Sequence, residues 1–346
     1  MIKVSNLTKK YGSNLAVDNI SFEIEKGRIY GFLGPNGAGK STTMNIITGC
    51  LSQTSGNVTV GGFDVFDQPV KAKKLIGYLP ELPPLYGDMT PKEYLRFVAE
   101  AKGIKSSAIG PEVERVMFRT SIKQVSGRLI RNLSKGYRQR VGIAMALLGD
   151  PEIIILDEPT VGLDPRQIIE IRELIKSLGE DHTVILSSHI LSEIQEVCEH
   201  VIIISRGKVV ADDTIENICN MNKEHPVLNI VASCTPDAAV AIVDEYEEVT
   251  HYAITECDKG TSLELTLMPG TNITEKLYFA FAAAGIPLSY FSDRVSIEEI
   301  YLKLTESVYD EEEETASVTE EAASDANEEE YKPMFTEEDN SDEGDL

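Results

Sequence analysis

The stretch Gly34-Pro-Asn-Gly-Ala-Gly-Lys-Ser-Thr42 decides the fold, because it gathers three glycines, a lysine and two hydroxyls in nine positions. It follows the strand-like run Arg28-Ile-Tyr-Gly-Phe-Leu33 and precedes Thr43-Met-Asn-Ile-Ile-Thr48, which has the pattern of a short helix ended by Gly49. Strand, loop and helix are the context that the phosphate-loop pattern G-x-x-x-x-G-K-[ST] requires. The glycines let successive N–H groups converge on phosphate oxygens, and the helix N-terminus adds partial positive charge. The stretch therefore predicts a phosphate-binding loop.

Individual residues of this loop have expected roles. Lys40 should reach the β- and γ-phosphate oxygens of a nucleotide, and Ser41 should ligate Mg²⁺. The phosphate contacts are expected from Asn36, Gly37, Ala38, Gly39, Lys40, Ser41 and Thr42.

Two further strand ends carry chemistry. The apolar run Ile153-Ile-Ile-Leu156 is followed by Asp157, expected to hold Mg²⁺ through water, and by Glu158, expected to act as general base on an attacking water. His189 follows the run Val184-Ile-Leu-Ser-Ser188, and we expect it to contact the γ-phosphate or that water. Since parallel strands end at one edge of a sheet, all three segments should meet at one site.

The hydrophobic pattern predicts an α/β fold over the first 220 residues. Residues 2–33 alternate like short strands, whereas residues 91–149 read as helices with no convincing strand and suggest a helical insertion. The apolar runs at 153–156 and 183–186 are separated by a helical stretch at 165–178 and followed by a third run at 201–204. Such runs between helices indicate a mainly parallel sheet covered on both faces.

The pattern restarts after about residue 222 and predicts a small α+β domain of ferredoxin-like type. Its expected order is strand, helix, strand, strand, helix and strand, at 227–233, 237–246, 251–255, 262–267, 274–284 and 288–291. A last helix is expected at 297–305. No chemical motif is recognisable in this part.

Charge is unevenly distributed along the chain. The formal net charge is -25, but residues 307–346 alone hold 17 Asp and Glu residues against one Lys. This segment lacks periodicity and has few apolar residues, so we expect a disordered acidic tail. The folded body is only mildly acidic, and no nucleic-acid partner is expected.

Hydropathy and cysteine spacing further restrict the class of protein. The N-terminus has no apolar leader pattern, and no run approaches the roughly 18 apolar residues of a spanning helix, so a cytosolic location is expected. The five cysteines are odd in number and far apart, and they predict reduced, mostly buried thiols rather than disulfides.

Over residues 1 to about 220 the sequence resembles the nucleotide-binding subunit of ATP-binding cassette (ABC) transporters. Besides the two motifs above, Leu133-Ser-Lys-Gly-Tyr-Arg-Gln-Arg140 is similar to the family signature. The stretch Asp157-Glu-Pro-Thr-Val-Gly-Leu-Asp164 is similar to Walker B running into the D-loop. His189 falls at the switch histidine, and Tyr11 falls at the aromatic residue that stacks on adenine.

The resemblance implies an ATPase that uses ATP and Mg²⁺ and works as a homodimer of cassettes. Two cassettes would pack head to tail, so that ATP on Lys40 of one is completed by Ser134 and Gly136 of the other. The partner would be a separately encoded polytopic permease, with the subunit cytoplasmic and peripheral on the inner face of the cell membrane. The implied domains are a cassette at 1–220, with an antiparallel β subdomain and a helical insertion at about 88–150, the small domain at 221–306 and the tail at 307–346.

Two positions depart from the family pattern. The signature has Lys135 and Tyr137 where the family has Gly and Gln, while it keeps the serine and the second glycine. Glu81 stands at the Q-loop position, where a carboxylate can still bind Mg²⁺ but cannot donate a hydrogen bond when ionised. Both departures resemble a branch of single-cassette exporter ATPases, similar to those of gliding motility and of multidrug or copper-related export.

The sequence leaves alternative functions open. A soluble cassette protein acting on ribosomes usually joins two cassettes, whereas this chain has one phosphate loop and one signature. A DNA-repair cassette would have long coiled coils between its Walker motifs, and a catalytically dead regulator would not need both Glu158 and His189. For an exporter, we expect Leu85, Tyr86 and Met89 to contact the permease. We expect Tyr94 and Phe97 to pack inside the helical insertion instead.

Overall fold

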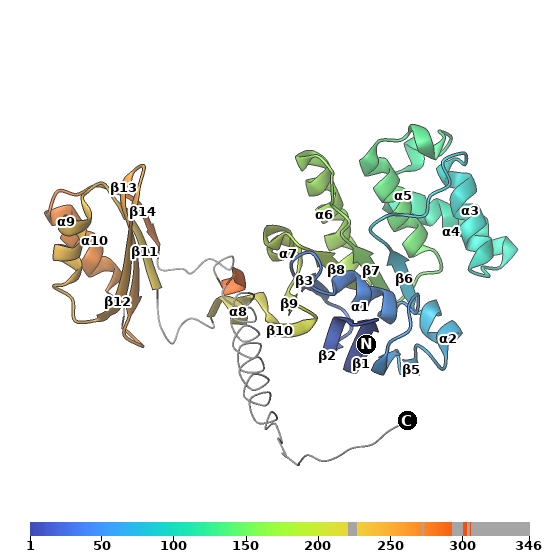
Figure 1. Cartoon of the computed structure of the whole chain (residues 1–346). Coiled ribbons are helices and arrows are strands. Elements are labelled where there is room, and N and C mark those ends of the chain that lie inside the picture. Colours follow the sequence, from blue (N-terminus) through green and yellow to red (C-terminus); the bar gives the residue numbers. More distant parts are fainter. Residues whose placement is uncertain (221–226, 272, 293–299, 303–304, 306–346) are drawn as a thin grey trace, which may run out of the picture. The chain divides into compact units, whose positions relative to one another are not determined.

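The computed structural model describes residues 1–220, 227–271, 273–292, 300–302 and 305 (Figure 1). The expected acidic tail at 307–346 lies outside the described residues, and so does most of the helix expected at 297–305.

A six-stranded sheet forms the centre of the cassette, with strand order β10-β9-β3-β8-β7-β6. Its strands are β3 (Ile29–Leu33), β6 (Ile76–Leu79), β7 (Ile153–Asp157), β8 (Thr183–Ser188), β9 (His200–Ser205) and β10 (Lys208–Thr214). All neighbours are parallel except β9 and β10. β3, β7 and β8 are buried along their whole length, as expected for strands covered on both faces. The predicted mainly parallel sheet is thus confirmed.

The register of this sheet aligns the three strand ends that carry chemistry. Asp157 pairs with Ser187, and Leu33, which directly precedes the phosphate loop, pairs with Ser188. The residues that follow β3, β7 and β8 are therefore brought to one edge of the sheet.

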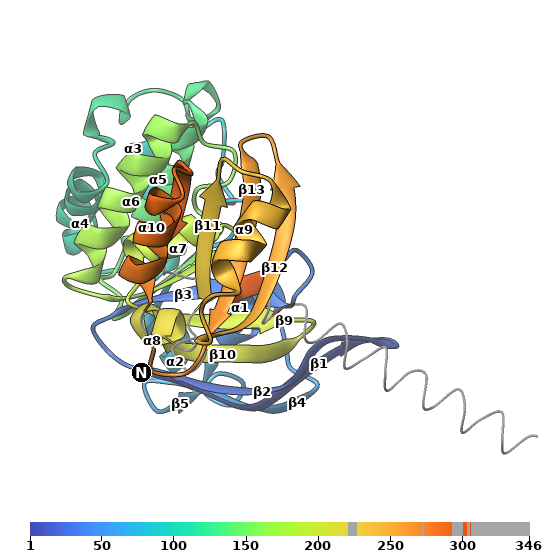
Figure 2. The same ribbon diagram turned by 90° about the vertical axis from the view of Figure 1, so that its left-hand side faces the viewer.

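A second, antiparallel sheet has the order β2-β1-β4-β5 and forms a separate layer (Figure 2). Its strands are β1 (Ile2–Tyr11), β2 (Asn14–Ile24), β4 (Ser55–Val60) and β5 (Phe63–Asp64). Helix α1 (Lys40–Ile47) shares one core with both sheets, in which Met44 and Ile46 meet apolar side chains such as Ile155. This packing fixes the start of α1, and with it the phosphate loop.

The helical insertion lies together as one group in Figure 1. It contains α3 (Pro91–Ala101), α4 (Ser106–Arg119), α5 (Lys135–Leu147) and two short 3₁₀ helices, Lys123–Val125 and Ile130–Asn132. Helix α3 begins at a capping box in which Thr90 and Glu93 satisfy each other's backbone N–H. The remaining cassette helices are α2 (Pro69–Lys74), α6 (Pro165–Gly179), α7 (Leu191–Val197) and α8 (Ile215–Asn220).

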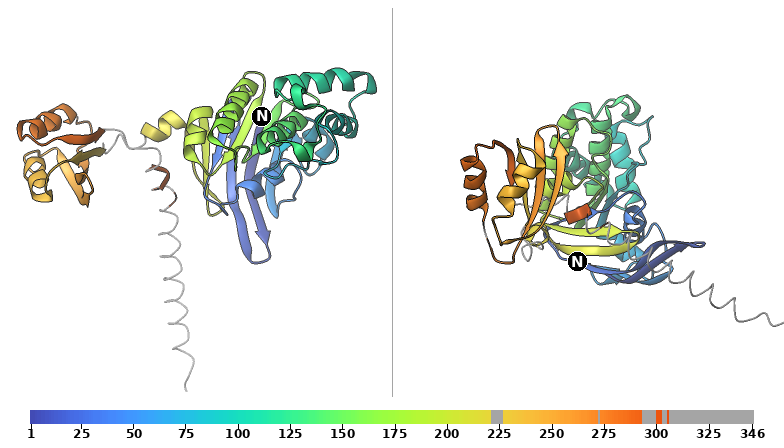
Figure 3. Two further views of the ribbon diagram at one scale, coloured as in Figure 1. Left: turned by 90° about the horizontal axis from the view of Figure 1, so that it is seen from above. Right: turned by 60° about the vertical axis from the view of Figure 1, so that its left-hand side comes forward.

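The third sheet belongs to the small domain and has the order β12-β13-β11-β14, with antiparallel neighbours throughout. Its elements follow in the chain as β11 (Val227–Ala232), α9 (Pro236–Val243), β12 (Val249–Cys257), β13 (Gly260–Leu267), α10 (Thr274–Ala283) and β14 (Leu288–Ser292). Both helices cover the same face of the sheet (Figure 3), where Leu277 and Phe281 of α10 are fully buried. The predicted order of strand, helix, strand, strand, helix and strand is confirmed. The strand order is that of a ferredoxin-like arrangement.

The cysteines are more exposed than the sequence suggested. Of the four whose side chains are described, only Cys198 is buried, Cys234 is intermediate, and Cys50 and Cys257 are exposed. Position in a loop or on an outward strand face decided their burial, which the residue type alone did not reveal. In the described part of the chain, no helix combines the length and apolar character needed to cross a membrane.

Candidate active site

The phosphate loop connects the end of β3 to the start of α1 in a tight curl. Gly39, the residue before α1, has a φ of 105°, and a Cβ there would lie 2.6 Å from the carbonyl oxygen of Ala16. Both the left-handed backbone and the close approach require glycine at this position. The loop is held from outside by the N–H of Gly207, which donates to the carbonyl oxygen of Ala38 at 2.9 Å.

Lys40 is the cation at the centre of the loop, and it is only 6% exposed. Its Nζ donates to the carbonyl oxygens of Gly34 at 2.7 Å and Pro35 at 3.2 Å, and it lies 3.7 Å from Oε1 of Glu158. Burial lowers the pKa of Lys40, while the nearby carboxylates of Glu158 and Asp157 oppose this shift. Phosphate oxygens would stabilise the charged form of this ammonium more strongly than the loop carbonyls do.

Asp157 and Ser41 form the candidate metal position. The Ser41 Oγ lies 3.4 Å from Oδ1 of Asp157, and the Ser187 hydroxyl donates to the same carboxylate oxygen at 2.5 Å. No group of three or more His, Cys, Asp or Glu side chains forms a metal cluster within the described residues. A cation here would thus take most of its ligands from phosphate and water, as Mg²⁺ does in nucleotide sites. A hydroxyl beside a carboxylate, next to a phosphate loop, fits that ion.

Glu158 lies between a cation and an imidazole. Its Oε1 faces Lys40, and its Oε2 is 2.9 Å from Nδ1 of His189. The residue is 7% exposed and has a φ of 48°, a conformation that is unfavourable for a residue other than glycine. The Glu158 N–H donates to Ser187 Oγ at 2.9 Å, which helps to hold this conformation. The carboxylate is thereby fixed beside the phosphate loop.

These groups line one cavity of about 500 Å³. Its walls are Ala16, Asn36, Gly37, Gly39, Lys40, Ser41, Thr42, Glu81, Glu158, Val161 and His189. Most of the residues predicted for the nucleotide, the metal and catalysis are therefore brought together. Tyr11 is 48% exposed and does not line the cavity, and the side chain of Ala38 packs into the core instead.

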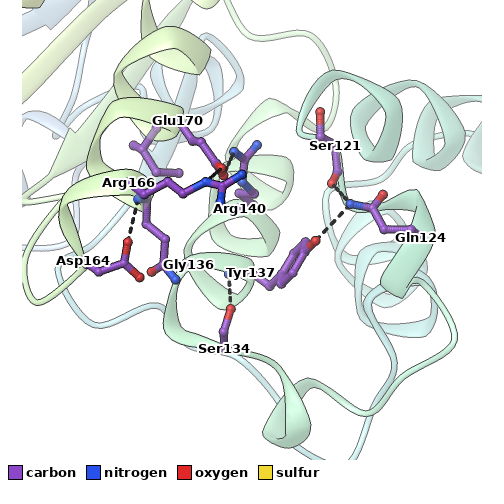
Figure 4. A pocket seen from close by; sticks show the side chains of 11 residues that line it. Ser121, Gln124, Ser134, Gly136, Tyr137, Arg140, Asp164, Arg166 and Glu170 are labelled. Carbon is purple, nitrogen blue, oxygen red and sulfur yellow. Dashed lines mark hydrogen bonds and ion pairs between the residues drawn. The ribbon is translucent and has the colours of Figure 1, made fainter.

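Ser134 and Gly136 line a different pocket, of about 430 Å³, between α5 and α6 (Figure 4). The Ser134 hydroxyl caps α5 by accepting the N–H of Tyr137 at 3.3 Å. A Cβ on Gly136 would lie 2.7 Å from Oε1 of Gln167, so the Gln167 side chain lies directly against the Gly136 backbone. In a single chain the signature residues and the phosphate loop thus belong to two separate pockets.

The signature pocket is walled by polar groups in Figure 4. The Tyr137 hydroxyl accepts a hydrogen bond from Nε2 of Gln124 at 3.2 Å, and Arg140 pairs with Glu170 at 2.9 Å. Tyr137, which departs from the family pattern, therefore contacts the 3₁₀ helix Lys123–Val125.

Several polar residues around the site were not singled out from the sequence. Ser187 binds Asp157 and Glu158, while Ser188 and Thr160 both donate to the buried carboxylate of Glu193. The available signal was an acidic residue within the otherwise apolar buried face of α7.

The predicted partner-contact residues divide into two groups. Leu85 and Met89 pack against the core of the helical insertion, and Tyr94 is buried as expected, so the first two offer less free surface than predicted. Tyr86 is 51% exposed and Phe97 is 44% exposed, which makes the expectation that Phe97 packs inside wrong. Phe97 lies on the outer side of α3, where its ring contacts Tyr86 at a centroid distance of 5.6 Å.

Comparisons with known proteins agree with this geometry. Residues 17–161 match the family model described as ABC transporter. The chain is 37% identical to bacitracin transport ATP-binding protein BcrA of Bacillus licheniformis, over 73% of this chain and 82% of that protein. It is 31% identical to linearmycin resistance ATP-binding protein LnrL of Bacillus subtilis (strain 168), over 88% of this chain and 98% of that protein.

Solved structures show the same cassette. A dimeric ATP-binding cassette in a post-hydrolysis state, bound to ADP and Pi, is similar with a TM-score of 0.57 and 27% identity, over 62% of this chain and 99% of that chain. The cassette cbiO1 of a Clostridium perfringens ABC transporter complex has a TM-score of 0.59 and 27% identity, over 64% and 91% of the two chains. The chain therefore belongs to the ABC transporter family, as an ATP-binding cassette ATPase.

Proposed function

We propose that the chain is the ATP-hydrolysing subunit of an exporter whose permease is a separate polytopic membrane protein. The observation that carries this proposal is the cavity in which Lys40, Ser41, Glu158 and His189 meet beside Asp157. The export assignment is supported by relatives named for bacitracin transport, lantibiotic transport and linearmycin resistance. The proposed location is the inner face of the cell membrane, through the permease.

In the proposed mechanism, the N–H groups of the phosphate loop and Lys40 bind the phosphates of ATP. Ser41 and the Asp157 carboxylate, with Glu81 nearby, would hold Mg²⁺, which withdraws charge from the phosphate being transferred. Glu158 accepts the proton of the water that attacks the γ-phosphorus. His189 holds Oε2 of that carboxylate by its 2.9 Å contact and orients the base.

The signature pocket would complete a second chain's site. Because Ser134 and Gly136 line a different pocket from Lys40, one chain cannot supply both to the same nucleotide without rearrangement. We propose a head-to-tail pair in which the α5 N-terminus of one chain faces the γ-phosphate bound by the other. The existence of dimeric cassettes among the similar structures supports this arrangement.

We propose that the permease contacts the exposed apolar side chains beside the Glu81 loop. Leu82 is 85% exposed, and the rings of Tyr86 and Phe97, which contact each other, are about half exposed. A pocket of about 430 Å³, more apolar than the nucleotide cavity, is lined here by Leu82, Pro83, Leu85 and Ile130. Exposed apolar groups around such a hollow are typical of protein interaction sites.

The test is to replace Leu82 and Tyr86 by Ser in the tagged full-length chain and to purify it from membranes of its own cells. We expect the unchanged chain to retain a polytopic membrane protein, and the L82S/Y86S variant to lose it with normal ATP affinity. The matched control is Phe66→Ser, which removes an equally exposed apolar side chain elsewhere and should not reduce retention. Co-purification with ribosomes instead would favour a soluble ABC ATPase acting on ribosomes, and equal retention of the double variant would contradict the contact surface.

A further inference from the structure

A buried carboxylate next to the active site has no part in the chemistry described so far. Glu193, on α7, is 2% exposed, and its Oε2 accepts hydrogen bonds from Thr160 Oγ1 at 2.6 Å and Ser188 Oγ at 3.1 Å. The described part of the chain gives Glu193 no ion pair. Its interactions are therefore directed at two hydroxyls, which are themselves 4% and 0% exposed.

The two hydroxyls belong to the segments that carry the reacting pair. Thr160 lies two residues after Glu158, in the turn that leaves β7. Ser188 is the last residue of β8 and directly precedes His189, and its Oγ also accepts the N–H of Ile190 at 3.0 Å. One carboxylate oxygen thus joins the segment of the base to the segment of the histidine.

Burial of a carboxylate at this position costs free energy, and packing alone would not require it. Its neighbours on the buried face of α7 are Leu191, Ile194 and Val197, so an aliphatic side chain would suit the same face without loss of hydration. An aliphatic side chain would, however, leave Thr160 and Ser188 as buried donors without an acceptor. Because one carboxylate oxygen accepts both hydrogen bonds, it fixes the two hydroxyls in one arrangement.

We propose that Glu193 is a positioning residue that sets the distance and orientation of Glu158 and His189 without touching the nucleotide. The 2.9 Å contact of these two residues spans the same pair of segments that Glu193 ties together. Ser187 forms a second link, since it accepts the N–H of Glu158 and donates to Asp157. This inference rests on the proposed role of Glu158 and His189 in hydrolysis.

The test compares Glu193→Ala, Glu193→Gln and Thr160→Val in the full-length chain. We expect Glu193→Ala to lower ATP turnover by about 10- to 100-fold, because small misplacements of catalytic groups have effects of this size. ATP affinity should change by less than about 3-fold, because the groups that bind the phosphates are untouched. Glu193→Gln should keep most of the turnover, since its amide oxygen can accept hydrogen bonds from both hydroxyls. The turnover of Thr160→Val should lie between those of Glu193→Ala and Glu193→Gln.

Thr120→Val is the matched control for loss of a buried hydroxyl. Thr120 is 0% exposed and donates to the Val116 carbonyl oxygen at 2.8 Å, on the helical insertion. This variant should lower the melting temperature without a comparable loss of turnover.

The NMR signals of the His189 imidazole provide a second readout. They would not change if Glu193 had only a structural role. The chain has five histidines, so the ring nitrogen resonances can be assigned by comparison with His189→Gln. We expect Glu193→Ala and Thr160→Val to shift the His189 resonances, and Thr120→Val to leave them unchanged. Unchanged His189 signals and turnover in Glu193→Ala, or equal inactivity of Glu193→Gln and Glu193→Ala, would overturn the proposal.

Two further measurements keep the test interpretable. If Glu193→Ala does not fold, Thr160→Val removes one of the two hydrogen bonds with little change in shape and decides the question in the same way. Glu158→Gln is measured in parallel, and normal turnover in that variant would refute the proposed hydrolytic pair, whereas the His189 resonances would still report on Glu193.

Discussion

Glu158 owes its position to neighbours rather than to its own conformational preference. Its left-handed backbone is unfavourable for a residue with a Cβ, and such conformations persist where the surroundings hold them. Hydrogen bonding by Ser187 and the contacts with Lys40 and His189 supply that support. These contacts orient the carboxylate toward the candidate nucleotide cavity, as the proposed general base requires.

Glu158→Gln should abolish most turnover and leave ATP binding intact. The amide has nearly the same shape but cannot take a proton from water, and loss of a general base typically lowers the rate by about 10²- to 10⁴-fold. The measurement is steady-state ATP hydrolysis by the chain with its permease, beside the affinity for ATP. Near-normal hydrolysis would show that another group is the base.

At this scale the motifs predicted the residues that meet at the candidate nucleotide cavity, but not the residues that hold them in place. Lys40, Asp157 and Glu158 occur in fixed local patterns, which a single sequence reveals. Glu193 and Thr160 are 33 positions apart and meet only because β7 and β8 are neighbours in the sheet. A hydrogen-bond partner that only tertiary packing brings near cannot be recognised from a local sequence pattern.

Helix α5 ends in a network of charged groups from the other two helices of the insertion. Lys102 donates to the carbonyl oxygens of Met145, Ala146 and Leu148, at 3.1, 3.3 and 2.9 Å. Of these carbonyls, that of Met145 also accepts the N–H of Leu148 at 3.4 Å. The last carbonyls of a helix have few N–H partners of its own, so a cation at this end is favourable. The network ties the end of α3 to the end of α5.

Helix α4 contributes a second pair to the same network. Arg115 donates to both carboxylate oxygens of Glu112, at 2.9 and 2.8 Å, and to the Leu147 carbonyl oxygen at 3.0 Å. The Gly149 N–H donates to the same carboxylate at 2.7 Å. We infer that Glu112 orients Arg115 and stabilises the turn that leads into β7.

Glu112→Gln should therefore lower the free energy of unfolding at neutral pH by about 1.5–3 kcal/mol, the range for a hydrogen bond to a charged group. The Arg115 hydrogen bond lowers the pKa of Glu112 in the folded state, so its contribution is present above the ordinary value of 4.5. It is lost as the pH falls through the lowered folded value. Burial lowers the pKa of Lys102 to about 8, so that group stays charged throughout this acidic range.

The measurement is urea unfolding of both proteins between neutral and acidic pH. The stability difference should be largest at neutral pH and should shrink below about pH 4.5. Lys92→Gln, which removes an exposed pair with Glu114, is the control and should change stability little. A difference that does not depend on pH would contradict this account of Glu112.

The helices and strands were predicted well where the hydrophobic pattern alone defines them. Their first and last residues were predicted less well. The pattern predicted helices within residues 91–149 without fixing their ends, and α4 begins at Ser106 and runs through Gly110 and Pro111. Proline and glycine weaken a helix locally, while burial of Ile109 holds the preceding turn in place. Helix α5 likewise begins at Lys135, because the Ser134 side chain caps it.

For the whole molecule, we expect truncation after Thr305 to leave ATP affinity and the melting temperature unchanged. All motif residues precede that position, and residues 307–346 have no core-forming pattern. Calorimetry and ATP titration of the truncated and full-length chains would check this. A large drop in either quantity would contradict the prediction that the tail is disordered.

The pattern of the sequence predicted both the cassette and the small domain, because each has its own alternation of strands and helices. What the small domain does could not be predicted, since none of the motifs lies in it. Its ferredoxin-like sheet has a closed core formed by α9 and α10, and it is matched along with the cassette by the relative LnrL, which spans 88% of this chain.

The most direct test of the account is the mass of the Glu158→Gln chain in solution, measured by analytical ultracentrifugation with and without MgATP. If two chains complete each other's sites through Lys40 and Ser134, the non-hydrolysing variant should be a monomer alone and a dimer with MgATP. The dimer should be lost when Lys40→Ala or Ser134→Arg is added, because the first removes phosphate binding and the second blocks the facing helix end. A Glu158→Gln chain that binds MgATP and remains monomeric at every concentration would contradict the central claim.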